Sequence, residues 1–248
     1  MSGFTDTLIH DAAERARRQQ IKQDKVLRWL RINTWSTSAV LMEVVGLGTR
    51  QAIHTTLTSM ARQGLVRQAE IRGDFGSSVY IWGITPHGAA IAAPDGESIQ
   101  AKTFELSKVN PATLAHSIDV QRLQLRAEQA DWCWTPAGDE FSRSAAKYAD
   151  AIAVRPDGQK VAIEVERTVK TVKRYADILV AHLEARKQGK WDWIYYLSPN
   201  STISNRVERA FSEINRAKWR GEGIKITDRH REPFKFFTYF DDWFVNQE

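Results

Sequence analysis

Apolar residues in the first part of the chain follow helical spacing and then strand spacing. Ser36 or Thr37 can cap one short helix and Thr49 the next, and a glycine ends each of them. The segments expected to be helical are residues 5–32, 39–45 and 50–64. The segments expected to be strands are residues 65–71 and 79–85. Helix, turn, helix and β-hairpin, in this order, predict a winged helix-turn-helix domain over residues 1–93.

A winged helix that reads DNA presents its second short helix and its hairpin loop to the duplex. Arg67, Arg72 and the loop of residues 73–78 would form this wing. The early, exposed positions of the expected recognition helix are Arg50, Gln51, His54 and Thr55. Protein contact or dimerisation is the alternative use of such a domain, because a fold does not dictate a function.

Residues 94–108 are mostly polar and begin with proline and glycine, which indicates a linker to a second domain over residues 109–248. The segments expected there are a helix at 110–129, strands at 132–134, 148–154 and 160–166, a helix at 168–188, a strand at 191–198, a helix at 201–218, and strands near Lys225 and at 234–240. The fold class is therefore α/β (α+β). The order αβββαβ fits the core of restriction-endonuclease-like nucleases.

Three carboxylates are expected to meet on two central strands of this second domain. The turn at residues 155–159 carries a type I signal with a three-residue loop. Counting back along both strands places Asp150 opposite Glu164, and Glu166 shares the face of Glu164 because side chains alternate along a strand. A two-residue loop would shift the register by one and take Asp150 out of the group.

A buried group of carboxylates is costly, because like charges repel each other and lose their hydration. The strands around them are apolar, which indicates that they are buried. Mg²⁺ or Mn²⁺ would offset that cost, and such an ion can activate water for phosphodiester chemistry. The residues expected to bind the metal and to act in catalysis are Asp150, Glu164 and Glu166. The alternative is an exposed hairpin whose acids are merely solvated or paired with cations.

Basic side chains follow the acids directly. Lys170 and Lys173 are expected at the start of the next helix, where either could be the catalytic lysine. Arg174 beside them could contact DNA. Tyr175 could assist or stack on a base, and packing in the core is an equal alternative.

The 248-residue chain carries a formal net charge of +5 and has a pI of about 9.3. Its basic residues concentrate at 14–31 and 166–190, beside segments for which a polyanionic partner is expected. The single cysteine, Cys133, excludes an internal disulfide and argues against a cysteine-ligated zinc site. No apolar run resembles a secretion signal or a membrane span, so we expect a cytoplasmic location without membrane insertion.

Asp150 followed by Glu164-Val-Glu166 resembles the PD-(D/E)xK signature of metal-dependent nucleases, with Glu166 in the place of the usual lysine. Over nearly its whole length the chain resembles the replication-relaxation family, and within it MobC-type plasmid mobilisation relaxases. The winged helix, the helix with His116-Ser-Ile118 and the run EVERTVKTVKRY at 164–175 carry this resemblance. It implies nicking of one DNA strand at an origin of transfer, with Asp150, Glu164 and Glu166 as catalytic and metal-binding residues. A coupling ATPase and an accessory mobilisation protein are the further partners that it implies.

Other interpretations stay open at this stage. His116 could abut the site from its helix, although a structural histidine is the stronger interpretation. A restriction-like or repair endonuclease would cut both strands, or damaged DNA, without a transfer origin. A non-catalytic winged-helix plasmid regulator would bind DNA and cleave nothing.

Overall fold

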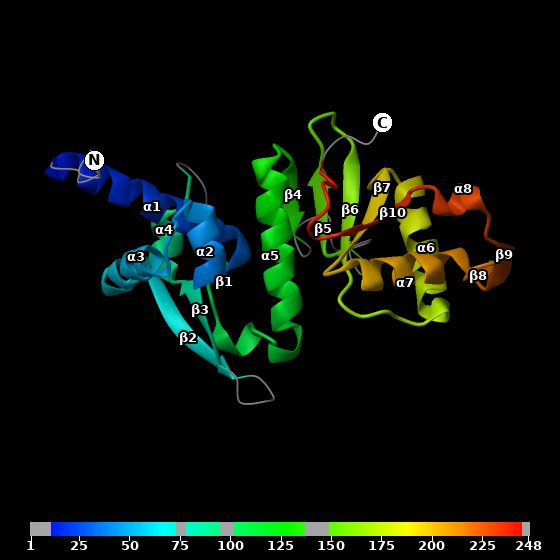
Figure 1. Ribbon diagram of the computed structural model, residues 1–248, viewed down its shortest axis with the longest axis horizontal. Helices are drawn as coiled ribbons and strands as arrows, with labels where there is room; N and C mark the ends of the chain where they lie inside the picture. The colour runs from blue at the N-terminus through cyan, green and yellow to red at the C-terminus, as the bar shows by residue number, and fades with distance from the viewer. Residues whose placement is uncertain (1–10, 73–77, 95–101, 137–148, 245–248) are drawn as a thin grey trace, which may run out of the picture. The chain divides into compact units, whose positions relative to one another are not determined.

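The residues that the computed structural model describes are 11–72, 78–94, 102–136 and 149–244 (Figure 1). The chain divides into two compact units, Met1–Ile118 and Asp119–Glu248. Each unit combines helices with a β-sheet, so the protein is mixed α/β, as the sequence predicts. None of the described helices is both long and apolar enough to cross a membrane.

Three helices with a common core form much of the first unit. They are α1 (Ala12–Asn33), α2 (Ser38–Val45) and α3 (Arg50–Arg62). Thr37 accepts a hydrogen bond from the backbone N–H of Val40, and Thr49 accepts one from Ala52, so α2 and α3 begin at predicted caps. The largest side chains that this core buries completely are Leu27, Leu30, Leu41, Ile53, Leu57 and Met60.

A three-stranded antiparallel sheet in the order β1-β3-β2 completes this core. Its strands are β1 (Trp35–Thr37), β2 (Val66–Arg72) and β3 (Ser78–Ile84). The hairpin of β2 and β3 confirms the prediction. The sequence pattern did not indicate β1, because three residues are too short to show a period and their partner strand lies far along the chain. Residues 73–77 of the expected wing loop are outside the described residues.

After β3 the chain forms α4 (Pro86–Ile91) and then returns to the sheet. Within the predicted linker, of which residues 95–101 are not described, Phe104 is buried and its N–H donates to the carbonyl of Ile84 over 3.0 Å. Gly83 makes room for this packing, since a Cβ atom there would lie 2.0 Å from the Phe104 ring. Two short 3₁₀ turns, η1 (Leu106–Lys108) and η2 (Pro111–Thr113), then lead to α5 (Leu114–Gln129).

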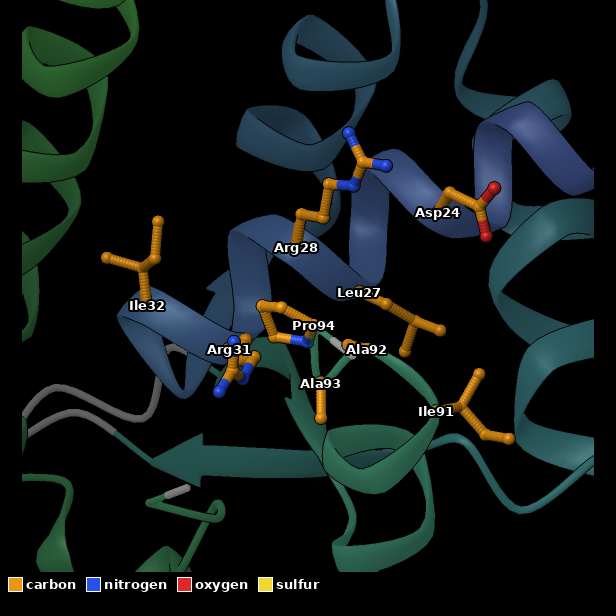
Figure 2. Close-up of a pocket in the computed structure, with 9 residues that line it drawn as sticks. All are labelled: Asp24, Leu27, Arg28, Arg31, Ile32, Ile91, Ala92, Ala93 and Pro94. Atoms are coloured by element: carbon orange, nitrogen blue, oxygen red, sulfur yellow. The ribbon is translucent and has the colours of Figure 1, made fainter. Parts of the chain in front are cut away.

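A groove of about 540 Å³ lies on the first unit between α1 and the end of α4 (Figure 2). Leu27 on α1 and Ile91 on α4 line it, together with the arginines at 28 and 31. Ile32 and Ile91 are exposed, so the groove leaves apolar surface beside basic side chains.

The second unit is built on a five-stranded sheet in the order β10-β7-β6-β5-β4. Its strands are β4 (Cys133–Pro136), β5 (Ala151–Val154), β6 (Lys160–Val165), β7 (Trp193–Ser198) and β10 (Phe234–Thr238). Strand β5 runs antiparallel to its neighbours β4 and β6, whereas β6, β7 and β10 run parallel. With α5 before β4 and α6 (Val172–Lys187) between β6 and β7, the expected αβββαβ order is present, and the C-terminal segment docks as the expected strand.

Helices cover both faces of this sheet. On one face, α6 and α7 (Ser201–Ser212) bury Tyr175, Leu179 and Phe211 against Ala162 and Tyr196 (Figure 1). The other face packs against α5 and the C-terminal segment, and its buried residues include Leu123, Ala127, Trp132, Ile163, Leu197 and Trp243.

The region after α7 differs from the prediction. A helix was expected over residues 201–218, but α7 ends at Ser212. The chain then forms a separate hairpin of β8 (Arg216–Trp219) and β9 (Glu222–Lys225), followed by the short helix α8 (Asp228–Arg231). The expectation fails because Ala217 is buried in the core beside α6, a tertiary contact that local sequence does not reveal.

Candidate active site

The hairpin of β5 and β6 has the predicted register. The N–H of Arg155 donates to the carbonyl of Gln159 over 2.9 Å, and Ala151 pairs with Ile163. Strand β5 begins at Ala151, directly after Asp150. The side chain of Asp150 accepts a hydrogen bond of 2.7 Å from the N–H of Val165. Asp150 is therefore fixed at the end of the ladder, next to Glu164.

Glu164 lies on the face of the sheet that α6 covers, and it pairs with Tyr196 of β7. Its Oε1 is 3.2 Å from Nε2 of His182, a fully buried residue of α6. Burial first, and then repulsion from Asp150 and Glu166, raises the pKa of Glu164 well above its usual value, although Lys170 opposes this. Burial lowers the pKa of His182 to about 3, so its ring is neutral at physiological pH.

Glu166 follows the end of β6 and is 3% exposed. Its Oε2 forms an ion pair with the ammonium group of Lys170 and accepts a hydrogen bond of 3.1 Å from the hydroxyl of Tyr175. The same hydroxyl accepts a hydrogen bond from the N–H of Lys170. Glu166 thus holds Lys170 in place. Tyr175 is buried and hydrogen-bonds to both residues, so its ring is not an exposed surface for stacking on a base.

The expected three-carboxylate centre is only partly assembled. Within the described ranges, no group of three or more histidine, cysteine, aspartate or glutamate residues could hold a metal ion. Glu166 is committed to Lys170, which leaves Asp150 and Glu164 as the neighbouring carboxylates.

The start of α6 also differs from the prediction. The helix begins at Val172 rather than at Thr168, because the side chain of Thr171 caps it by accepting from the N–H of Arg174. Lys170 therefore lies in the preceding loop, where it can fold back onto Glu166. Lys173 and Arg174 lie on the first turn of α6 and are exposed.

His182 and Tyr196 are residues of this site that the sequence interpretation missed. His182 lies seven residues after Tyr175, on the same face of α6, so a polar residue within an apolar helical stripe was the available signal. Tyr196 is 1% exposed, and burial, Glu164 and Glu166 raise its pKa. His116, the histidine singled out from the sequence, is half-buried and belongs to the first unit.

A second polar cluster lies in the same unit. Arg167, which directly follows Glu166, forms an ion pair with Asp119 of α5. The hydroxyl of Tyr239, just after β10, donates to the same Asp119 oxygen over 3.1 Å. Side chains from α5, from the loop after β6 and from the C-terminal segment are thereby tied together next to Glu166.

The residues expected to contact DNA in the first unit divide into two groups. On α3, the four predicted recognition residues are exposed, opposite the buried Ile53 and Leu57: they are Arg50, Gln51, His54 and Thr55. Arg72 is also exposed. Arg67 instead donates to the carbonyl of Phe104 and lies over its ring, which gives it a structural contact within the unit.

Asp150 and Glu164 provide two neighbouring carboxylates, the type of ligand that suits a divalent cation. Hard cations such as Mg²⁺ bind through one or two carboxylates and retain several waters. Burial and mutual repulsion make the charged form of Glu164 costly, and a cation would remove that cost. Both residues retain some exposure, so solvent can reach them.

Comparison with known proteins places the chain in a family. No curated protein and no solved structure matches it significantly. A family model described as replication-relaxation matches residues 27–194, which is more than half of the chain and includes Asp150, Glu164, Glu166 and His182. This match indicates a role in plasmid replication or mobilisation and an interaction with DNA. The chain belongs to the replication-relaxation family.

Proposed function

We propose that this protein is a metal-dependent DNA relaxase that nicks plasmid DNA at an origin of transfer to start mobilisation. The observation that carries the proposal is the placement of Asp150 beside Glu164 at the end of a buried hairpin, with the Glu166–Lys170 pair next to them. In this proposal the second unit is a PD-(D/E)xK-type, restriction-endonuclease-like core, and the first unit is a winged helix-turn-helix.

Each side chain of the site has a distinct task in this proposal. Asp150 and Glu164 would hold Mg²⁺ or Mn²⁺, which supplies Lewis acidity and an activated water. The hydrogen bond from Val165 orients Asp150, and His182 orients Glu164. Lys170 would bind the scissile phosphate and offset the charge that develops on it.

The departure from the PD-(D/E)xK signature has a physical explanation in this arrangement. Glu166 stands in the place of the usual lysine, and it holds the ammonium group of Lys170 from four residues further along. Lys170 is therefore the preferred catalytic lysine. Lys173, the other candidate, is exposed on the first turn of α6 and lines a groove there.

The first unit would bring the second to its DNA. The exposed residues of α3 would enter the major groove, where arginine and glutamine can read base edges. Exposed cations on α1 would add contacts to phosphates that do not depend on sequence.

Nicking of supercoiled plasmid DNA tests the proposal. We expect the wild-type protein to convert supercoiled plasmid carrying an origin of transfer to open circles with Mg²⁺ or Mn²⁺, and to be inactive in EDTA. Asp150→Asn and Glu164→Gln should each abolish nicking and retain DNA binding, measured by fluorescence anisotropy. Glu208→Gln, at an exposed position of α7, is the matched control and should remain active.

The same assay separates the remaining functions. Linear product from plasmids without an origin of transfer would favour a restriction-like or repair endonuclease. DNA binding without cleavage in any metal would favour a non-catalytic plasmid regulator. Nicking that survives both Asp150→Asn and Glu164→Gln would reject this site as the catalytic centre.

A further inference from the structure

A second groove of about 540 Å³ lies beside the start of α6. Val172, Lys173 and Ala176 form its wall on α6, and residues 213–218 with Gly223 form the other. The loop that carries Lys170 leads directly into this first turn of α6, so the groove adjoins the carboxylate site.

The hairpin of β8 and β9 presents cations on one of its faces. Arg216 pairs with Lys225 across the strands, and Lys218 lies two residues from Arg216, so the three side chains share a face. All three are exposed, and within the described ranges none of them forms an ion pair. Like charges directly opposite each other destabilise a hairpin, which favours an anionic partner for this face.

The opposite face of the hairpin is anchored to α6. Ala217 is buried, and the indole N–H of Trp219 donates to Oε1 of Glu184 over 2.6 Å. Lys187 of α6 lies over the Trp219 ring. Because the apolar face rests on α6, the basic face is held outward.

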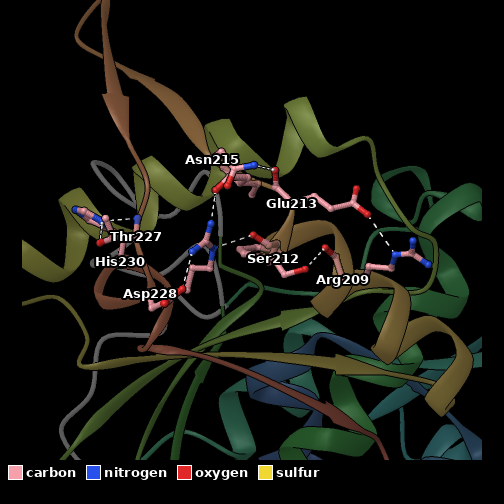
Figure 3. A network of polar contacts seen from close by, with 10 residues as sticks. Arg209, Ser212, Glu213, Asn215, Thr227, Asp228 and His230 are labelled. Atoms are coloured by element: carbon pink, nitrogen blue, oxygen red, sulfur yellow. Dashed lines mark hydrogen bonds and ion pairs between the residues drawn. The ribbon is translucent and has the colours of Figure 1, made fainter.

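The base of the hairpin is also fixed. The N–H of Ile226 donates to the carbonyl of Asn215 over 3.0 Å, which closes the hairpin. Arg231 donates to the carbonyls of Phe211 and Ile214 and to the Asp228 carboxylate, and this joins the end of α7 to α8 (Figure 3). The backbone that carries the cations is therefore held in place against α6.

We propose that this groove and the basic face of the hairpin bind the phosphate backbone of the DNA strand that flanks the nicked bond. The inference rests on the proposed function and names the surface that holds its substrate. Four cations line or border the groove, at 173, 216, 218 and 225, against the acids Asp177 and Glu213. Arg209 already pairs with Glu213, which leaves a positive balance. At Gly223, opposite Lys218, a Cβ atom would meet the guanidinium of Arg216 at 3.6 Å, so this arginine lies across the face of the hairpin.

A charge-neutralising double variant tests this surface in the full chain. Arg216→Gln/Lys218→Gln should bind a short fluorescent single-stranded DNA of mixed sequence more weakly than the wild type. The magnitude of the slope of log K against log salt concentration should fall by about 0.7 for each phosphate contact removed, the value for single strands. In the nicking assay the variant should need more DNA for half-maximal rate, at an unchanged maximal rate.

The matched control is Arg206→Gln/Arg229→Gln, which removes two exposed cations from α7 and α8. It should keep the wild-type slope and affinity. An unchanged salt-dependence slope in the hairpin variant, or an equal fall of the slope in the control, would overturn the inference. Asp150→Asn tests catalysis independently of this result. The wild-type protein could cleave no DNA while the hairpin variant still binds DNA more weakly than the wild type. That result would support the groove as a DNA-binding surface and reject the proposed nuclease activity.

Discussion

Glu164 and His182 face each other in surroundings that disfavour charge on either of them. Burial and the neighbouring carboxylates raise the pKa of Glu164, and burial lowers that of His182 to about 3. A raised pKa in the folded state means that Glu164 contributes stability at low pH, and that this contribution is lost as the pH rises through the raised value. At pH values above the usual pKa of glutamate, burial of Glu164 therefore lowers the stability of the metal-free protein.

We predict that Glu164→Gln stabilises the metal-free protein at neutral pH, because glutamine cannot ionise and the cost of burying Glu164 is removed. The gain in Tm over the wild type, measured in EDTA, should shrink as the pH is lowered below the raised pKa of Glu164. Added Mn²⁺ should raise the Tm of the wild type and leave that of the variant unchanged. A variant that is less stable than the wild type in EDTA at every pH would contradict the prediction.

The hydroxyl groups of Tyr196 and Tyr175 should differ in their contributions to stability. Within the described residues, the buried Tyr196 hydroxyl has no hydrogen-bond partner, whereas that of Tyr175 joins Glu166 and Lys170. Tyr175→Phe should cost about 1.5–3 kcal/mol of unfolding free energy, because a hydrogen bond to a charged group is lost. Tyr196→Phe should cost nothing, and denaturant titration of both variants measures the difference. An equal loss in the two variants would show that Tyr196 has a partner too.

At the scale of elements, local chemistry predicted some features and tertiary contacts decided others. The hairpin of β5 and β6 was predictable because the turn at 155–159 sets its register. The position of Lys170 before the Thr171 cap of α6 was not, because Tyr175 holds this lysine beside a buried carboxylate. In the same way, α7 ends at Ser212 because Asn215 closes the next hairpin with Ile226, eleven residues away in sequence.

Gly83 provides a test of the segment that packs on β3. A methyl group at this position would overlap the Phe104 ring, so Gly83→Ala should displace the ring and cost about 1–3 kcal/mol of unfolding free energy. Gly48→Ala is the matched control, since a Cβ atom there meets nothing within 4 Å. Thermal denaturation compares the two variants. Equal stability would show that Phe104 packs elsewhere in solution.

At the scale of the whole molecule, the two units have separate hydrophobic cores. Most of the order of elements was predictable from hydrophobic period, except for β1 and the region after α7, and the turn at 155–159 predicted the placement of Asp150 next to Glu164. The pairing of Glu166 with Lys170 was not, because this lysine was expected within a helix and lies in the loop before it. The sequence also did not predict which strand pairs with the C-terminal strand, because β10 and its partner β7 lie far apart in the chain.

Two cores predict that unfolding is not a single two-state transition. In scanning calorimetry, the measured enthalpy should exceed the van't Hoff enthalpy. Gly83→Ala should lower only the transition of the first unit, and Tyr175→Phe only that of the second. One sharp transition that both variants shift equally would show that the units unfold together.

The position of β10 in the sheet has a consequence for biosynthesis. A ribosome delivers Asp150, Glu164 and His182 well before residues 234–238, which form the outer strand beside β7. The first unit draws on residues before 119 and can fold while translation continues. The first unit can thus fold early in synthesis, whereas the sheet that carries the carboxylate site is completed only after β10 has been made.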